Sequence, residues 1–496
     1  MKNQIFNPYL PLSTCIPDGE PHVFGDRVYI YGSHDKEGGD RFCMLDYEVW
    51  SASVDDLTNW TCHGTSYRAK QDPDCDERHP DMYAPDVVQG NDGRYYLYYA
   101  LAGKAFTGPI HVAVSDKPEG LFEFYGCVKN ADGTPYWRNI TFDPGVINDN
   151  GVIRLYYGWG LAAPQLANAG KIKRFFMKPM MRVLEQKMFE KSKADIKREK
   201  DGIQGAFTVT LAEDMLTVTS EPKKILPAQF DAKGTQFEGH AFFEASSIRK
   251  IENTYYFIYS SEVNHELCYA TSKYPDRDFT YGGVIVSNGD IGYKGRKEAD
   301  RLAMTGNNHG SIECMNGKWY IFYHRQTHRT TFSRQGCAEP IEILADGSIP
   351  MVEMTSSGLN GAALLPVGAY PAPIACNLTN GKMKHIGQIG DYSGLPYITH
   401  DDDDDEKFIA DINDNTLIGY KYFAFDGKKN LSLAVKIEGE GCFEIYADDE
   451  KLGELVYCDC KEWTHKTLEI DMTGEKALYF KFKGSGLAQL LEFRFS

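Results

Sequence analysis

Five polar residues recur at matching points of a repeated pattern along this chain of 496 residues. Each lies roughly eleven to thirteen residues before an aromatic-rich strand that follows a turn of Gly, Asn and Asp; the five are Asp18, Asp86, Asp143, Glu244 and His309. An isolated acid in a loop usually caps a turn or pairs with a lysine. Four carboxylates and one histidine at the same point of a repeat indicate a shared site instead.

Paired carboxyl groups of this kind can hydrolyse a glycosidic bond with inversion. One protonated carboxyl donates to the leaving oxygen, and one carboxylate activates water on the opposite face of the sugar, at a separation of roughly 6.5–9.5 Å. A third carboxylate beside the acid raises its pKa by repulsion between like charges. Asp18, Asp143 and Glu244 match these three roles in number and type.

The elements that would position these residues are the blades of a β-propeller. The repeated phrase occurs five times, as GDRVYIYGS, NDGRYYLYYA, DNGVIRLYYGW, IENTYYFIYSS and MNGKWYIFYHR. Tyrosine-rich strands joined by hairpin turns at a long fixed period are typical of propellers. The pattern therefore predicts an all-β fold in which residues 1–357 form a five-bladed propeller.

The interval between the third and fourth copies is longer than the others and predicts an insertion at about residues 165–203. Within it, residues 171–200 contain 11 Lys or Arg and four acids, with apolar residues at helical spacing. A basic amphipathic helix can bind a membrane surface or a partner protein, and a scaffold role through this segment is one alternative. We favour an inserted helical hairpin that packs on the propeller or on a second subunit, which would make the protein a homo-oligomer.

The repeated phrase stops after Pro350, and a second domain follows. Residues 358–374, with three closely spaced prolines, are predicted to be a linker, and residues 375–496 to be a β-sandwich of short strands. The acidic run Asp401–Asp405 is predicted to be a solvated loop, with a bound calcium ion as the alternative.

Composition narrows the class of partners. A formal net charge of −17 argues against nucleic acid and anionic membranes, which need a basic face. The chain has no apolar stretch of the length of a signal peptide or of a membrane span. Its 12 scattered cysteines are typical of reduced thiols, so we expect a cytoplasmic protein without organic cofactor.

Six motifs in order add a resemblance to a known family. NPYLP, PDGEP, YAPD, FDP, FFEASSI and NNHGSI resemble glycoside hydrolase family 43, which comprises five-bladed, inverting enzymes acting on arabinose- and xylose-containing polymers. The resemblance implies Asp18 as general base, Asp143 as modulator of the pKa of the acid, and Glu244 as general acid. Glu238 is the alternative acid, although it lies six residues earlier in the repeat.

The resemblance also implies further site residues. It makes His309 the residue that helps to hold a hydrated calcium ion in the channel, or a histidine that only hydrogen-bonds an acid or the substrate. Arg334 would contact the sugar and the modulator carboxylate, as a planar charged fork can. Tyr83 replaces the tryptophan usual in the family at the wall of the sugar subsite, and Asp86 would bind a sugar hydroxyl. The C-terminal sandwich resembles carbohydrate-binding modules in architecture only.

These observations predict an inverting exo-glycosidase that releases α-L-arabinofuranose, β-D-xylose or both from short oligosaccharides. Besides this function and the scaffold role through residues 171–200, two alternatives remain. One is a non-catalytic sugar-binding propeller, and the other is a related propeller glycosidase acting on another sugar.

Overall fold

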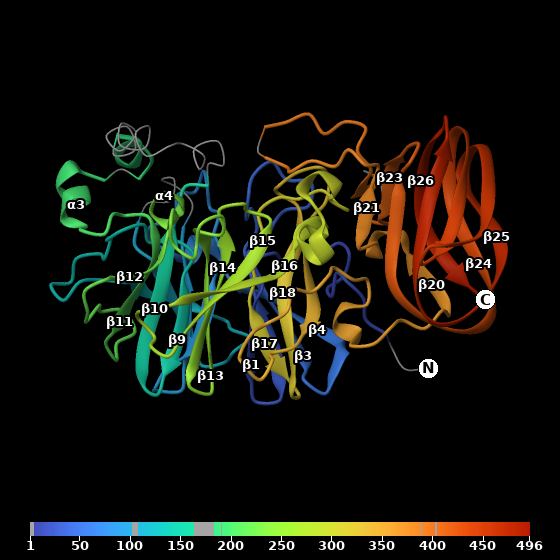
Figure 1. The fold of residues 1–496 in the computed structure, drawn as a ribbon. Coiled ribbons are helices and arrows are strands. Elements are labelled where there is room, and N and C mark those ends of the chain that lie inside the picture. The colour runs from blue at the N-terminus through green and yellow to red at the C-terminus, as the bar shows by residue number, and fades with distance from the viewer. Residues whose placement is uncertain (1–3, 102–107, 163–182, 190, 388, 402–403) are drawn as a thin grey trace.

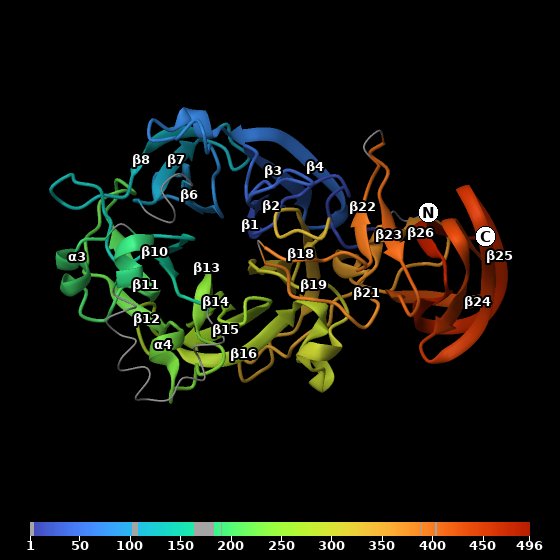
Figure 2. The same ribbon diagram turned by 90° about the horizontal axis from the view of Figure 1, so that it is seen from above.

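The chain folds into a ring of five small antiparallel sheets followed by a separate β-domain (Figures 1 and 2). This computed structural model describes residues 4–101, 108–162, 183–189, 191–387, 389–401 and 404–496. The predicted all-β class, the five-bladed propeller and the C-terminal β-domain are confirmed.

The blades follow one another along the chain. Blade 1 contains β1 (Glu20–Phe24), β2 (Arg27–Tyr31), β3 (Tyr47–Ser53) and β4 (Asp56–Tyr67), and blade 2 contains β5 (Asp86–Gln89), β6 (Tyr95–Tyr99), β7 (His111–Ser115) and β8 (Glu123–Cys127). Blade 3 contains β9 (Gly145–Asp149), β10 (Val152–Trp159), β11 (Gly205–Leu211) and β12 (Lys223–Pro227). Blade 4 contains β13 (Phe242–Ile251), β14 (Thr254–Ser261), β15 (Glu266–Ser272) and β16 (Thr280–Ser287), and blade 5 contains β17 (Ile312–Met315), β18 (Lys318–Gln326) and β19 (Arg334–Ile341).

The repeated aromatic phrase is the second strand of every blade, and its residues are buried on both faces. Both faces are covered because each blade packs against two neighbours. A separate apolar cluster fills each of the five interfaces between neighbouring blades, including the one between blades 5 and 1. Strand-forming aromatic residues therefore hold the ring together by packing between sheets rather than around one centre.

The N-terminal segment closes the ring by lying against β19, the last strand of blade 5. The Tyr9 N–H donates to the Gly336 carbonyl. The buried Asn7 amide donates to the Ala338 carbonyl at 2.9 Å and accepts from the Ala338 N–H at 3.0 Å. The same amide also donates to the Glu339 carboxylate and to the Thr355 carbonyl. The Asn7 side chain thus makes the pair of hydrogen bonds to Ala338 that a residue of a neighbouring strand would make.

The predicted insertion lies partly outside the described residues. Residues 183–188 and α3 (Lys193–Arg198) are helical, and the short helix α4 (Gln229–Ala232) follows β12. No helix in the described ranges is long and apolar enough to cross a membrane. All 12 cysteines are free thiols in this structure.

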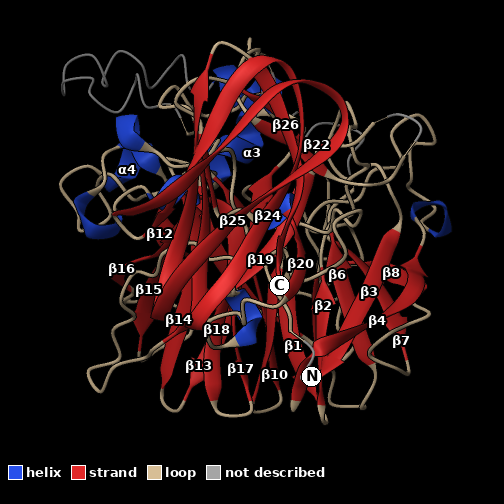
Figure 3. Cartoon of the chain, turned by 90° about the vertical axis from the view of Figure 1, so that its right-hand side faces the viewer, coloured by secondary structure: helices blue, strands red, loops and turns tan. Residues whose placement is uncertain are grey.

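The C-terminal domain is built from seven strands around one large apolar core (Figure 3). They are β20 (Gly368–Pro371), β21 (Asn377–Thr379), β22 (Tyr397–Thr399), β23 (Phe408–Ile412), β24 (Leu417–Ala447), β25 (Glu450–Gly484) and β26 (Leu487–Phe495). The sandwich begins earlier than predicted, because β20, within the predicted linker, pairs with β26. A proline is tolerated there at the end of a short edge strand.

The two domains share a polar, buried junction. Arg325 of β18 donates to the carbonyls of Pro373 and Ala375, and Lys421 of β24 pairs with Asp290 and Glu353. Above this junction, the segment between β21 and β22 reaches from the C-terminal domain across the top of the propeller (Figure 1). In this segment, the Lys384 carbonyl accepts a hydrogen bond from the Thr305 N–H, and the Ile386 N–H donates to the Thr305 carbonyl.

We predict that Asn7→Ala destabilises the propeller by about 2–4 kcal/mol, because it leaves buried backbone groups of β19 without partners. Five of the six tryptophans lie in the propeller, so urea unfolding followed by tryptophan fluorescence measures the change. The exposed Asn59 provides the control variant, Asn59→Ala, for which we expect no shift of the midpoint. Equal midpoints for Asn7→Ala and the wild type would contradict this account of ring closure.

Candidate active site

Four of the five repeated polar residues meet at one pocket on the propeller axis. Asp18, Asp143, Glu244 and His309 line a cavity of about 330 Å³, together with the predicted substrate residues Tyr83 and Arg334. Asp18, Asp143 and His309 immediately precede the first strands of their blades, and Glu244 lies in β13. The five-fold repeat therefore brings together residues that are far apart in the sequence.

The backbone at the pocket is held in a sparsely populated conformation. Asp18, Asp143 and Ala245 have φ angles of 58°, 45° and 70°, in the left-handed region that costs energy for residues other than glycine. Such strain persists only where surrounding contacts enforce it, and it is common at functional sites.

Asp18 is buried and yet ionised. Burial by itself would raise its pKa, but Arg334, whose Nη1 donates to Asp18 Oδ1 at 2.9 Å, and His324, with Nδ1 at 3.2 Å, hold the pKa of Asp18 well below its ordinary value. A carboxylate in this state is ionised at any ordinary pH, which is the form that a general base needs.

Arg334 is itself fixed by a second carboxylate. Its Nε and Nη2 donate to the two oxygens of Asp35 at 2.8 and 2.9 Å, a bidentate pair that sets the plane of the guanidinium. The side chain is only 2% exposed, and it lies over the Phe42 ring at 4.7 Å. The hydrogen bonds of Arg334 thus connect it to Asp18, the predicted base, rather than to the predicted modulator Asp143.

Glu244 has the opposite character. Burial and then the charge of Asp18 raise the pKa of Glu244 to about 8, against smaller opposing effects of Arg334 and of hydrogen bonds to Asn307 and Trp159. Its carboxyl group is therefore protonated at neutral pH and can donate that proton. The pocket thus holds one carboxylate ready to accept a proton and one carboxylic acid ready to donate one.

Asp143 is coupled to the same acid. Burial, the Glu244 charge and the Asp18 charge together raise the pKa of Asp143 well above its ordinary value, although the Ala245 N–H donates to its Oδ2 at 3.0 Å. His309 Nδ1 lies 3.7 Å from that oxygen and 4.0 Å from Asp18 Oδ1. Burial lowers the pKa of His309 to about 4, so its imidazole is neutral.

Aromatic rings of the propeller and one loop of the C-terminal domain complete the walls of the pocket. Phe42, Tyr83, Phe142, Trp159 and Phe243 line the pocket, and flat apolar faces of this kind pack against the C–H groups of a sugar. His385, Ile386 and Gly387 line it from the segment between β21 and β22 of the C-terminal domain.

Sequence reasoning missed several of these residues. Trp159 ends the third copy of the repeat, so its position was a usable signal. Asp35, His324 and the C-terminal loop carry no pattern that points to the site.

Two predicted or alternative site residues are not at the pocket. Asp86 does not line it, because it is already paired within β5, where its Oδ1 lies 2.6 Å from His22 Nε2 and its Oδ2 accepts from the Val146 N–H. Asp86 thus links blade 2 to blades 1 and 3, which corrects its predicted role in binding a sugar hydroxyl. Glu238 is exposed and accepts from the Gly234 N–H, which excludes it as the acid.

Comparisons with known proteins agree with this geometry. Residues 7–205 match the family model described as glycosyl hydrolases family 43. A xylosidase/arabinosidase of Thermoclostridium stercorarium is 45% identical over 99% of both chains. A xylosidase/arabinosidase of Bacteroides ovatus is 30% identical, over 70% of this chain and 97% of its own.

Solved structures show the same relationship. A family 43 β-xylosidase/α-arabinofuranosidase from a compost metagenome, in complex with xylotriose and in a calcium-free form, has a TM-score of 0.52 and 28% identity over 71% of this chain and 98% of its own. A family 43 enzyme of Xanthomonas citri, in complex with xylotriose, has a TM-score of 0.52 and 25% identity over 73% of this chain and 97% of its own. With an acid and a base in one propeller pocket and a relative that is 45% identical over the full length, this chain is a glycoside hydrolase and belongs to glycosyl hydrolases family 43.

Proposed function

We propose that this protein is an inverting exo-glycosidase that removes β-D-xylose and α-L-arabinofuranose from the ends of short oligosaccharides. The observation that carries the proposal is the opposite protonation of two carboxyl groups in one pocket, Asp18 ionised and Glu244 protonated. The two sugars present similar hydroxyl patterns, so one pocket suits both. The names of the relatives from Thermoclostridium stercorarium and Bacteroides ovatus support this pair of sugars.

In the proposed reaction, Asp18 accepts a proton from a water molecule whose oxygen attacks the anomeric carbon. The bond from that carbon to the glycosidic oxygen breaks as Glu244 gives its proton to the leaving oxygen. The sugar leaves with inverted configuration, Asp18 is left protonated and Glu244 ionised, and solvent restores both. Arg334 orients Asp18, and Asp143 is a third carboxyl group of the pocket, whose pKa the neighbouring Glu244 helps to raise.

A pocket rather than an open groove supports action at chain ends. The rings of the propeller and the loop that carries His385–Gly387 surround a volume of about 330 Å³, which suits one or two sugar units rather than a polymer. The xylotriose complexes of two solved relatives support an oligosaccharide as substrate.

The surroundings of His309 do not favour an ion ligand. The groups of three or more candidate ligands within the described part of the chain do not include it. The carboxylates nearest its Nδ1 are Asp18 and Asp143, which the reaction needs, and Arg334 already occupies Asp18. We propose that His309 is a neutral partner of Asp143, and we derive no step through calcium. The cytoplasmic location and the oligomer through the insertion stay predictions.

Glu244→Gln tests the assignment of the acid. We expect kcat/KM on xylobiose to fall by roughly 10³-fold or more, because its leaving alcohol needs a proton. The loss on p-nitrophenyl β-D-xyloside should be much smaller, because nitrophenolate leaves without one. Asp18→Asn should abolish turnover of both substrates and of p-nitrophenyl α-L-arabinofuranoside.

Glu238→Gln is the matched control, the same change at an exposed residue six positions away, and should behave as the wild type. Proton NMR of the wild-type reaction should show α-xylose as the first product from a β-xyloside. First release of β-xylose, or equal losses on both leaving groups in Glu244→Gln, would refute the proposed roles.

The pH dependence of kcat/KM should follow Glu244. Because the acid form is active and its pKa is about 8, activity should fall as pH rises above about 8. The pKa of Asp18 is lowered, so Asp18 should stay ionised even at a pH below the ordinary pKa of an aspartate. Asp18 should therefore cause no loss of activity in the moderately acidic range. In Glu244→Gln, measured with the nitrophenyl substrate, the alkaline fall should disappear; its persistence at the same pH would assign it to another group.

Ile386→Ala tests the contribution of the C-terminal domain to the pocket. Ile386 is 1% exposed and lines the pocket, so the loss of apolar contact should raise KM by roughly tenfold with little change of kcat. Ile389→Ala, in the same loop at a side chain that is 96% exposed, should leave both constants unchanged. Steady-state kinetics on xylobiose that give equal values for the two variants would exclude a role of this loop in binding.

A further inference from the structure

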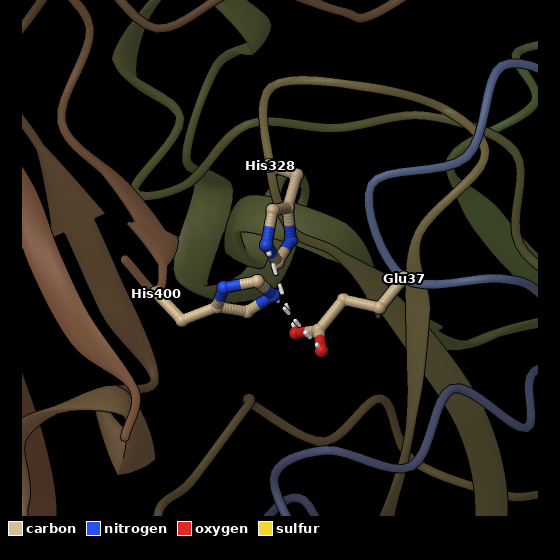
Figure 4. A group of neighbouring side chains, drawn as sticks. All are labelled: Glu37, His328 and His400. Atoms are coloured by element: carbon tan, nitrogen blue, oxygen red, sulfur yellow. Dashed lines mark ion pairs between the residues drawn. The ribbon is translucent and has the colours of Figure 1, made fainter. Parts of the chain in front are cut away.

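A cluster of potential metal ligands lies at the junction of the two domains, outside the sugar pocket. Glu37 is in the connection from β2 to β3, His328 in the connection from β18 to β19, and His400 directly after β22. One ligand atom from each residue lies within 4.8 Å of the other two. Figure 4 shows the three side chains pointing toward one another from three different segments.

The two imidazoles present the same nitrogen to Glu37. His328 Nε2 lies 3.6 Å from Glu37 Oε1, and His400 Nε2 lies 3.4 Å from Glu37 Oε2. The opposite nitrogens are engaged elsewhere: His400 Nδ1 lies 3.0 Å from the Asp401 carbonyl, and His328 Nδ1 lies 3.0 Å from the Thr327 hydroxyl. The Asp401 carbonyl can only accept, and the Thr327 hydroxyl donates to the Ser333 carbonyl, so both imidazoles carry their proton on Nδ1. In this tautomer the Nε2 lone pair is free for a metal.

The atoms that face the centre of the cluster are not satisfied by protein groups. Glu37 Oε1 and His328 Nε2 are buried and have no hydrogen-bond partner among the described residues. Their separation of 3.6 Å is long for a hydrogen bond. It is close to the roughly 3.3–3.4 Å that separates two ligands placed about 2.0–2.1 Å from a tetrahedral zinc ion.

One cation already contacts the cluster. Lys407, which is 4% exposed, has its Nζ 2.9 Å from Glu37 Oε2. This ammonium forms an ion pair with Oε2 of Glu37, while Oε1 stays available. It also repels a second cation, so it should weaken metal binding without preventing it.

We propose that Glu37, His328 and His400 bind a zinc ion that joins the propeller to the C-terminal domain. Two imidazoles and one carboxylate form a ligand set that zinc uses, with water as the fourth ligand. This site is separate from the pocket that contains His309, and none of its three ligands lines that pocket.

Zinc here would hold three segments that shape the sugar pocket. The connection that carries Glu37 also carries Asp35, the partner of Arg334, and Phe42 of the pocket wall. The connection with His328 carries Thr331, another lining residue, and the segment with His400 continues from the loop of Ile386. The ion would therefore stabilise the arrangement of the pocket without taking part in the reaction.

The test uses the full chain, with any affinity tag removed, after treatment with a chelator. Calorimetric titration with zinc should give one site for each chain, and thermal unfolding should shift to higher temperature as zinc is added. Co²⁺ in place of zinc should give the visible absorption of a tetrahedral site. His400→Ala and His328→Ala should weaken zinc binding by at least about 10–100-fold. Loss of a residue that only supports a metal ligand already lowers the affinity by that much, and these two residues are the ligands themselves.

His465→Ala, an exposed histidine of the same domain as His400, is the matched control and should bind zinc as the wild type does. Lys407→Met should bind zinc more tightly than the wild type, because the ammonium that competes for Glu37 is gone. If the cluster were only a structural ion pair, this variant would not gain affinity for zinc. Should a variant fail to fold, His400→Gln removes the imidazole with a smaller change of volume. No zinc binding by the wild type, or equal binding by His400→Ala and His465→Ala, would overturn the proposal.

Discussion

One buried arginine sets the chemistry of the pocket. Without Arg334, the burial of Asp18 would favour its neutral form, and the pocket would contain acids but no base. The guanidinium can serve Asp18 because Asp35 holds it by two parallel hydrogen bonds from behind. The ionised Asp18 in turn helps to keep Glu244 protonated. Opposite protonation of two similar side chains thus follows from one cation placed next to only one of them.

The propeller supplies the rigidity that this arrangement needs. Each interface between blades has its own apolar cluster, so the first strands of the blades are held at fixed angles around the axis. The polar residues at or just before the starts of those strands have two uses. Some face the pocket, whereas Asp86 ties three blades together through His22 and the Val146 N–H. Equivalent positions of a repeat can therefore serve either catalysis or the cohesion of the ring.

The C-terminal domain belongs to the site as well as to the stability of the molecule. Its loop contributes His385, Ile386 and Gly387 to the pocket, and it is anchored on the propeller by backbone hydrogen bonds at Thr305. Buried Arg325 and Lys421 fix the junction behind it. The long bent strands β24 and β25 give the domain a core of its own from which this loop extends.

By itself, the sequence determined the repeat and hence the blades, because hairpin turns and aromatic strands are local patterns that do not depend on distant contacts. Equivalent places in the repeat identified Asp18, Asp143, Glu244 and His309, which become neighbours at the pocket. Tyr83 and Arg334, which also line it, followed from the resemblance to the family. Only the tertiary structure decided that Asp86 faces His22, that Arg334 serves Asp18 through Asp35, and that a loop of the second domain reaches the pocket. These facts depend on contacts between residues up to several hundred positions apart, for which a single sequence carries no local signal.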